Sequence, residues 1–104
     1  VEINQTPYKH SVLLSSDGAT LEWPAKSFSD LESSHFKQMV DLKPELILIG
    51  TGSRQQFPKP ELLKSLISAK IGFEIMDSQA ACRTYNILVG EGRKVLLALI
   101  VEPT

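Results

Sequence analysis

The chain has 104 residues, of which 42% are hydrophobic and 22% are charged, and its formal net charge is −1. A chain of this length buries roughly two-thirds of the surface that its unfolded form exposes, so residues 1–104 are expected to fold as one domain without a cofactor or a disulfide. The near-neutral charge argues against a nucleic-acid partner, and no apolar run approaches the roughly 20 residues that span a bilayer, so a soluble protein is expected.

The N-terminal part predicts an arm followed by a β-hairpin. Residues 1–10 are polar and interrupted by Pro7, which favours an irregular arm. Two short runs with apolar residues, 11–15 and 19–23, flank a Ser-Asp-Gly turn at residues 16–18. An Asp-Gly pair between two such runs is typical of a hairpin.

The middle of the chain predicts a helix, a buried strand and a second helix. Ser29–Glu32 has the capping-box pattern that satisfies free backbone N–H groups at a helix start, and this helix should end near Leu42. Residues 45–49 are apolar after the first residue, as in a strand that is covered on both faces. Pro60 is well placed as the first residue of the second helix. The expected buried stripe of that helix consists of Leu62, Leu63, Leu66 and Ile67.

The last third predicts a strand, a third helix and a final strand. Residues 70–76 complete a unit of strand, helix and parallel strand. Asp77 or Ser78 can cap the next helix, and residues 95–101 form another continuously apolar strand. This order of elements predicts a single three-layer α/β domain, with a central mixed sheet flanked by helices and an N-terminal β-hairpin. The apolar face of the third helix is expected to contain Ala81, Tyr85 and Leu88.

Two segments are expected to meet at the carboxyl edge of this sheet. If the two inner strands run parallel, the loop Gly50–Arg54 and the helix start Asp77–Arg83 lie side by side. Ligands usually bind at this edge of open α/β sheets, and glycines there allow a ligand to approach the backbone. The candidate ligand-binding residues are Gly50, Thr51, Gly52, Arg54, Arg83, Thr84 and Asn86.

Two interpretations of the polar residues on the third helix remain open. Arg83 could bind an anionic group through two hydrogen bonds, aided by Arg54 and by free helix N–H groups. Alternatively, Arg83 pairs with a carboxylate such as Asp77 or Glu74, while its polar neighbours tie loops to the helix.

In a parallel arrangement of the last strand, Glu91-Gly92-Arg93 would lie at the opposite edge of the sheet.

Known catalytic and cofactor motifs are incomplete in this chain. Gly50-Thr51-Gly52 has half of a dinucleotide fingerprint, but Gln55 occupies the third glycine position, and no P-loop follows. Cys82 lies early in the third helix beside an arginine, a setting that lowers a thiol pKa. Neither His10 nor His35 is placed to act as its base, so a buried core cysteine is favoured over a catalytic one. The sequence predicts no metal site and no cofactor.

The run A-A-C-R-T-Y-N at residues 80–86, followed by E-G-R at 91–93, resembles a family of small domains of unknown function that includes the mitochondrial complex I assembly factor 3. The resemblance extends over Leu13–Val101. It implies an α/β fold and a non-enzymatic assembly or adaptor protein with a protein partner. The family pattern matches at Gly50, Thr51, Gly52, Asp77, Ala80, Ala81, Arg83, Thr84, Tyr85, Asn86, Leu88, Glu91, Gly92 and Arg93.

Two functional hypotheses follow from different classes. The first is the assembly or adaptor protein, in which Phe57 or Trp23 provides the apolar contact with the partner. The second is a small protein or enzyme of unknown reaction that binds an anionic ligand in a cleft formed by Gly50–Arg54 and Asp77–Asn86. A bacterial cytoplasmic location is preferred to a mitochondrial one because the chain has no Arg-rich leader. The sequence identifies neither the partner nor the oligomeric state.

Overall fold

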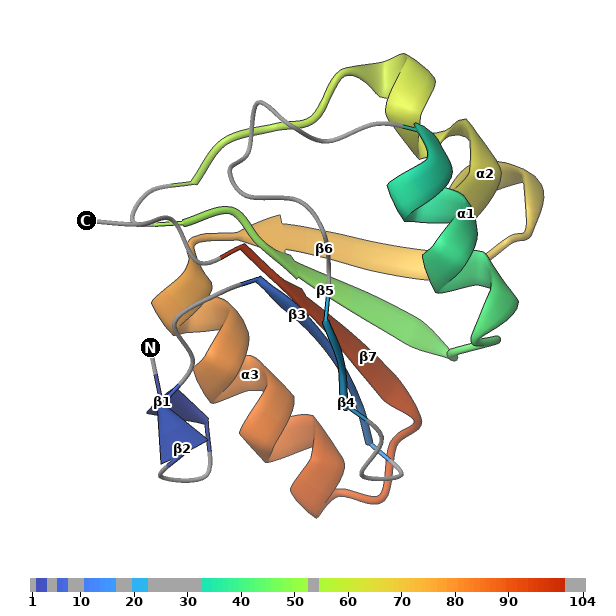
Figure 1. Ribbon diagram of the computed structural model, residues 1–104. Coiled ribbons are helices and arrows are strands. Elements are labelled where there is room, and N and C mark those ends of the chain that lie inside the picture. The colour runs from blue at the N-terminus through green and yellow to red at the C-terminus, as the bar shows by residue number, and fades with distance from the viewer. Residues whose placement is uncertain are drawn as a thin grey trace.

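The computed structural model describes residues 2–3, 6–7, 11–16, 20–22, 33–52 and 55–100, and Figure 1 shows the arrangement of their elements. The strands are β1 (Glu2–Ile3), β2 (Thr6–Pro7), β3 (Val12–Ser15), β4 (Thr20–Glu22), β5 (Leu46–Gly50), β6 (Gly72–Met76) and β7 (Val95–Leu99). The helices are α1 (Ser33–Asp41), the 3₁₀ helix η2 (Pro60–Leu63), α2 (Lys64–Ser68) and α3 (Ser78–Gly90).

Five strands form a mixed sheet in the order β4-β3-β7-β5-β6. Strands β5, β6 and β7 are parallel, whereas β3 is antiparallel to both β4 and β7. This arrangement confirms the mixed sheet and the hairpin predicted from the sequence, although the hairpin turn itself lies outside the described residues. Strand β7 occupies the middle of the sheet. Near the N-terminus, β1 and β2 pair with each other in a separate antiparallel ribbon.

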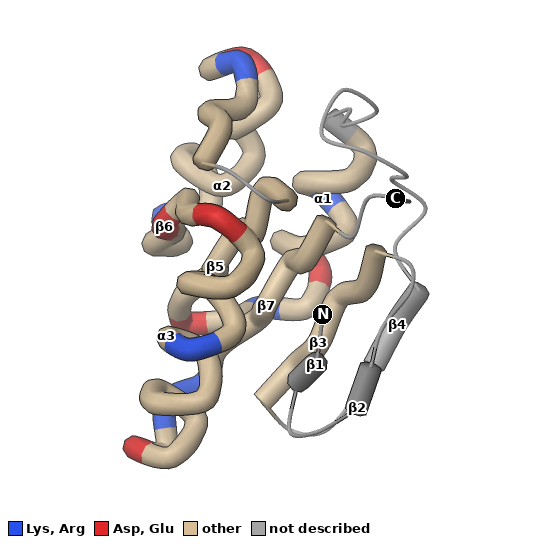
Figure 2. The backbone as a smooth tube through the Cα atoms, turned by 90° about the vertical axis from the view of Figure 1, so that its left-hand side faces the viewer, with Lys and Arg blue, Asp and Glu red and all other residues tan. Residues whose placement is uncertain are grey.

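Helices cover both faces of the sheet and produce the predicted three layers (Figure 1). Helices α1, η2 and α2 pack together on one face, and α3 lies across β5 and β7 on the other. The inner strands β3, β5 and β7 contain no charged residue (Figure 2), as expected for strands that are covered on both sides. No helix in the described part of the chain is long and apolar enough to cross a membrane.

Alternating strand residues divide the core between the two helical layers. Toward α1 and α2, the buried side chains are Leu13, Phe36, Met39, Ile47, Ile49, Leu66, Leu96, Ala98 and Ile100. Toward α3, they are Val12, Leu14, Leu48, Ala81, Cys82, Tyr85, Val95, Leu97 and Leu99, with Leu88 packed against them. The predicted apolar face of α3 is therefore confirmed.

The predicted stripe of the second helix is wrong at Ile67. Leu66 is fully buried, but 62% of Ile67 is exposed. The segment begins as a 3₁₀ helix at Pro60, and the α-helical part that follows has only five residues. Because adjacent residues on an α-helix point about 100° apart, a short helix that buries Leu66 against the sheet turns its neighbour toward solvent.

The amino edge of the sheet carries an ion pair between the start of β5 and the start of β7. Arg93 Nε donates to Glu45 Oε1 at 2.8 Å, and both side chains are about half exposed. Since β7 is parallel to β5, the Glu91-Gly92-Arg93 corner lies at the opposite edge from Gly50, as expected for a parallel last strand. An exposed pair of this kind contributes about 0–1 kcal/mol to stability.

Candidate functional site at the carboxyl edge

The loop after β5 and the start of α3 meet at the carboxyl edge, as the parallel arrangement predicts. The Thr51 N–H donates to the Met76 carbonyl at 2.9 Å, which extends the β5–β6 pairing by one residue. The Ser78 N–H donates to the Gly52 carbonyl at 2.8 Å. These two bonds fix the first helical turn directly against the Gly-Thr-Gly loop. Arg54 lies outside the described residues.

The Ser78 hydroxyl joins three elements at this edge. Its Oγ accepts a hydrogen bond from the Gly52 N–H at 2.8 Å and donates one to the Ile100 carbonyl at 3.1 Å. The Ser78 side chain is buried, as are both of its partners. The hydroxyl therefore links the loop after β5, the start of α3 and the end of β7.

The sequence pattern identified Ser78 only as one of two possible helix caps. The structure gives that role to Asp77, whose Oδ1 accepts a hydrogen bond from the Ala80 N–H at 2.9 Å. The bridging role of Ser78 depends on two partners that are each more than 20 residues away in the chain. No local spacing rule reveals such a bridge.

Gly50 allows the start of α3 to approach the sheet. A Cβ atom on Gly50 would lie 2.8 Å from Leu99 Cδ1 and 3.1 Å from both Ser78 Cα and Ser78 Oγ. Gly52 has a positive φ of 97°, in the left-handed region that favours glycine. The absence of a side chain at Gly50 therefore leaves room for the first turn of α3.

Thr51 and the residues after the loop complete a network of internal hydrogen bonds. Thr51 Oγ1 donates to the Met76 carbonyl at 3.2 Å and accepts from the Gln56 N–H at 3.0 Å. The side-chain amide of Gln56 donates through Nε2 to the Thr51 carbonyl at 3.3 Å. The side-chain amide of Gln55 donates through Nε2 to the Ile75 carbonyl at 2.9 Å. Backbone N–H groups at Thr51 and Gly52 thus donate to protein atoms rather than toward a bound anion.

The three candidate residues on α3 occupy different environments. Arg83 is exposed, and within the described part of the chain it forms no ion pair with Asp77 or Glu74. Thr84 is half-buried, and its hydroxyl lies 3.7 Å from Met76 Sδ. Asn86 is exposed. The structure therefore brings Thr84 to the carboxyl edge and leaves the Arg83 and Asn86 side chains on the outer surface of the helix.

Cys82 is a buried core residue, as the sequence favours. Only 7% of it is exposed, and it belongs to the cluster under α3. Burial raises the pKa of the Cys82 thiol, opposite to the decrease expected from the helix position and the adjacent arginine. The reason is that burial penalises the charged thiolate. In the described residues, no group of three His, Cys, Asp or Glu side chains is arranged to hold a metal ion.

Phe57 is the most exposed large apolar side chain among the described residues, with 68% of it accessible. The segment that carries it is nevertheless held in place. Gln55 and Gln56 before it are hydrogen-bonded to the ends of β6 and β5, and Pro58 after it is buried. Trp23, the other candidate partner contact, lies outside the described residues.

These features define a small three-layer α/β domain in which the start of α3 is hydrogen-bonded to the loop after β5 at the carboxyl edge of the sheet. The chain belongs to the family described as protein of unknown function DUF498/DUF598, whose model matches residues 1–100.

Three proteins show what this chain is similar to. The 13 kDa major membrane protein of Francisella tularensis subsp. holarctica (strain LVS) is 35% identical over 100 residues, which cover 94% of this chain and 80% of that protein. The NADH dehydrogenase [ubiquinone] 1 alpha subcomplex assembly factor 3 of Xenopus tropicalis is 36% identical over 87 residues, or 82% of this chain and 47% of that protein. A crystal structure of a Bordetella parapertussis protein, 40% identical, superposes with a TM-score of 0.87 and covers 95% of this chain and 85% of that one.

Proposed function

We propose that this domain is a non-enzymatic assembly or adaptor protein that captures a protein partner through the surface around Phe57. The observation that carries the proposal is the exposure of this aromatic ring on a segment whose neighbouring residues are bound to the domain. A large apolar side chain that is exposed on a well-held segment is typical of a residue that dominates a protein interface.

The contacts on either side of Phe57 lower the cost of binding. A flexible loop must be ordered when a partner binds, and that ordering opposes association. Here Gln55 and Gln56 already bind the sheet edge, and Pro58 is already buried. The residues on either side of the ring are therefore already bound to the rest of the domain before any partner arrives.

The names of relatives support a partner that is itself a protein. Assembly factor 3 relatives are named for the NADH dehydrogenase alpha subcomplex, and this chain spans about half of their length. By analogy, we propose a subunit of a respiratory or other membrane complex as the partner, met from the bacterial cytoplasm or, alternatively, inside a mitochondrion. The domain would hold such a subunit during assembly without chemical change.

Phe57→Ser is expected to weaken partner capture at least tenfold while leaving the melting temperature nearly unchanged. An exposed side chain contributes little to folding, so its loss should alter stability by no more than about 0.5 kcal/mol, whereas removal of a hot-spot aromatic costs about 2 kcal/mol or more in binding. The measurement is affinity purification of the tagged chain from cells of its own source, with quantitative mass spectrometry of the bound proteins.

Ile87→Ser is the matched control, because Ile87 on α3 is 63% exposed and therefore comparable to Phe57 in exposure. Capture should survive in this variant. Equal recovery of the same proteins with Phe57→Ser and with the unmodified chain would contradict the proposal.

A second function, binding of a small anion at the start of α3, is favoured by one observation. Arg83 is exposed and forms no ion pair with the carboxylates of Asp77 or Glu74. A guanidinium near a helix N-terminus can bind phosphate or carboxylate groups. This second function has less support than the first, because the N–H groups of the neighbouring loop already donate to protein atoms.

Under this second function, a thermal-shift screen against phosphates, nucleotides and carboxylates should yield a stabilising ligand. A compound at about 100 times its dissociation constant adds roughly 2.7 kcal/mol to the free energy of unfolding. Arg83→Ala should remove that stabilisation while the protein without ligand keeps its melting temperature. A stabilising compound that acts equally on Arg83→Ala would exclude Arg83 from the ligand site.

A further inference from the structure

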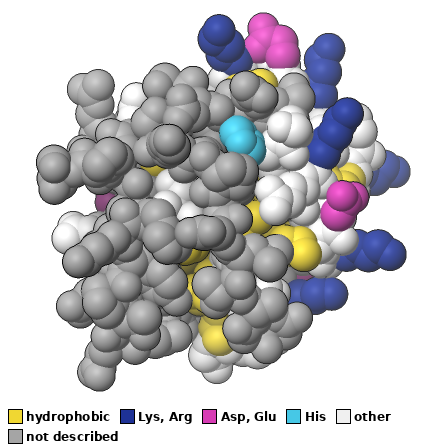
Figure 3. Space-filling view, in the orientation of Figure 1, with side chains coloured by type: hydrophobic (Ala, Val, Ile, Leu, Met, Phe, Trp, Pro, Cys, Tyr) yellow, Lys and Arg dark blue, Asp and Glu magenta, His cyan; other side chains and the backbone are white. Residues whose placement is uncertain are grey.

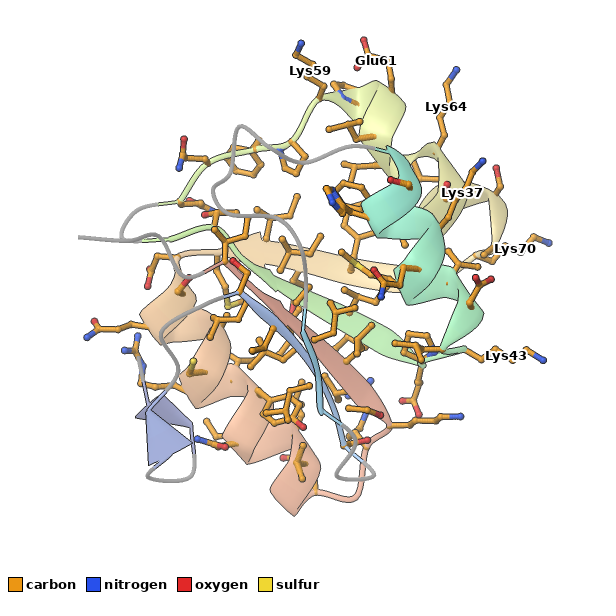
Figure 4. The ribbon with its side chains drawn as sticks, in the orientation of Figure 1. Lys37, Lys43, Lys59, Glu61, Lys64 and Lys70 are labelled. Carbon is orange, nitrogen blue, oxygen red and sulfur yellow. The ribbon has the colours of Figure 1, made fainter. Side chains whose placement is uncertain are left out.

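Five lysines gather on the outer side of the layer formed by α1, η2 and α2. We name this set the lysine face; all five side chains are exposed, and Figure 4 shows them pointing outward along one margin of the molecule. The space-filling view shows basic side chains along the same margin (Figure 3). The members of the lysine face are Lys37, Lys43, Lys59, Lys64 and Lys70.

The positive charge of this layer is largely uncompensated. Residues 33–44 and 55–71 contain two carboxylates, Asp41 and Glu61, against the five lysines. Within the described residues, no ion pair involves any of these lysines. With five lysines and two carboxylates, these two segments are positively charged, whereas the whole chain has a formal net charge of −1.

Exposed aliphatic side chains lie among these lysines. Ile67, which is 62% exposed, is three residues from Lys64 on one side and from Lys70 on the other. Residues three apart are neighbours on a helix surface, so the Ile67 side chain and the Lys64 ammonium leave α2 on the same side. Leu42, beside Lys43 at the end of α1, is 36% exposed.

We infer that the lysine face docks the domain on the surface of an anionic phospholipid bilayer, with Ile67 entering the interfacial region. Lysines near a membrane are attracted by its negative surface potential within a Debye length. An aliphatic side chain between them adds an apolar contribution to binding. The domain would then lie on the membrane as a peripheral protein, oriented with α1 and α2 toward the lipid.

The chemistry of the face favours a lipid surface over an acidic protein. The lysine face contains five lysines and no arginine. Lysines suit a delocalised negative field, because an ammonium is a point charge on a flexible stem. Recognition of individual carboxylates would favour the fixed fork of arginine. The lysines also come from two helices and their ends, so a broad planar surface can attract them together without fixed pairing.

The experiment is vesicle co-sedimentation of the full chain. One set of vesicles contains equal parts of phosphatidylcholine and phosphatidylglycerol, and the other contains phosphatidylcholine alone. At about 0.1 M salt, binding is expected only to the anionic vesicles, and it should be lost near 1 M salt, where the Debye length falls to about 3 Å. Each lysine near an anionic surface is expected to change the partition coefficient by about fivefold.

Variants locate the contact on the molecule. Lys64→Gln should weaken binding about fivefold and Lys64→Gln/Lys70→Gln about 25-fold. Ile67→Ser should also weaken binding to the anionic vesicles at low salt. Ile87→Glu is the matched control because it also lowers the net charge by one, but at an exposed position on α3, on the other face of the sheet (Figure 1). Its binding should be unchanged.

Three results would overturn the inference. The first is failure to bind anionic vesicles, and the second is equal binding to both vesicle types. The third is an equal loss of binding in Ile87→Glu and Lys64→Gln, which would reflect net charge rather than the lysine face. Binding to poly-glutamate without binding to vesicles would assign the face to an acidic protein instead. Phe57 does not belong to the lysine face. A failure to bind vesicles therefore leaves the test of partner capture by Phe57 unaffected.

Discussion

Ser78→Ala is expected to lower the free energy of unfolding by about 2–4 kcal/mol. The hydroxyl accepts from the Gly52 N–H and donates to the Ile100 carbonyl, and all three groups are buried. Its removal leaves one donor and one acceptor unpaired away from water, at a cost of about 1–3 kcal/mol each. Alanine is a better helix former than serine, which offsets up to about 0.5 kcal/mol.

The loss is measured by urea unfolding monitored by circular dichroism. In a domain near this size, each kcal/mol also lowers the melting temperature by about 4–8 °C. Ser68→Ala provides a matched control, because Ser68 is exposed on α2 and its replacement should change stability by no more than about 0.5 kcal/mol. If Ser78→Ala were as stable as Ser68→Ala, the bridging hydroxyl would not hold the carboxyl edge together.

Gly50→Ala is expected to destabilise the domain by about 1–3 kcal/mol through overpacking. The added methyl group would lie 2.8 Å from Leu99 Cδ1 and 3.1 Å from Ser78 Cα. The leucine side chain can move, but the Ser78 backbone belongs to the first turn of α3. The start of the helix must therefore shift away from the sheet, which strains the hydrogen bonds between Gly52 and Ser78.

Gly90→Ala separates this packing effect from the general effect of replacing glycine. Gly90 lies at the end of α3, and a Cβ there would meet nothing within 4 Å. This variant should be neutral or stabilised by up to about 1 kcal/mol, because alanine reduces the entropy of the unfolded chain. Thermal unfolding of the two variants side by side measures the difference. Equal melting temperatures would contradict the close approach of α3 to β5.

Much of the fold was predictable because its signals are local. The continuous apolar runs of β5 and β7 are typical of strands covered on both faces, and the parallel pairing of β5 with β6 follows from the intervening helix. The sequence left the direction of β7 open. The spacing of Ala81, Tyr85 and Leu88 correctly predicted the buried face of α3. The juxtaposition of the Gly50–Gly52 loop with the start of α3 follows from the same parallel topology.

The parts that could not be predicted depend on packing in three dimensions. A sequence cannot show that the start of α3 packs closely against Gly50, because a ligand at a strand end would need the same small residue. The pKa of Cys82 depends on whether desolvation outweighs the helix dipole, and that balance requires a burial measurement. The orientation of Ile67 was mispredicted because the helix that carries it begins with a 3₁₀ turn, which changes the phase of the apolar stripe.

The most direct test of the adaptor account is site-specific photo-crosslinking in cells of the source organism, with a photoreactive phenylalanine analogue at position 57. The same analogue at position 87 is the control, because Ile87 is similarly exposed on α3. The account predicts crosslinks from position 57 to one or a few defined proteins, and none of these from position 87. Crosslinks to the same proteins from both positions, or none from position 57, would contradict the claim that the Phe57 surface captures a partner.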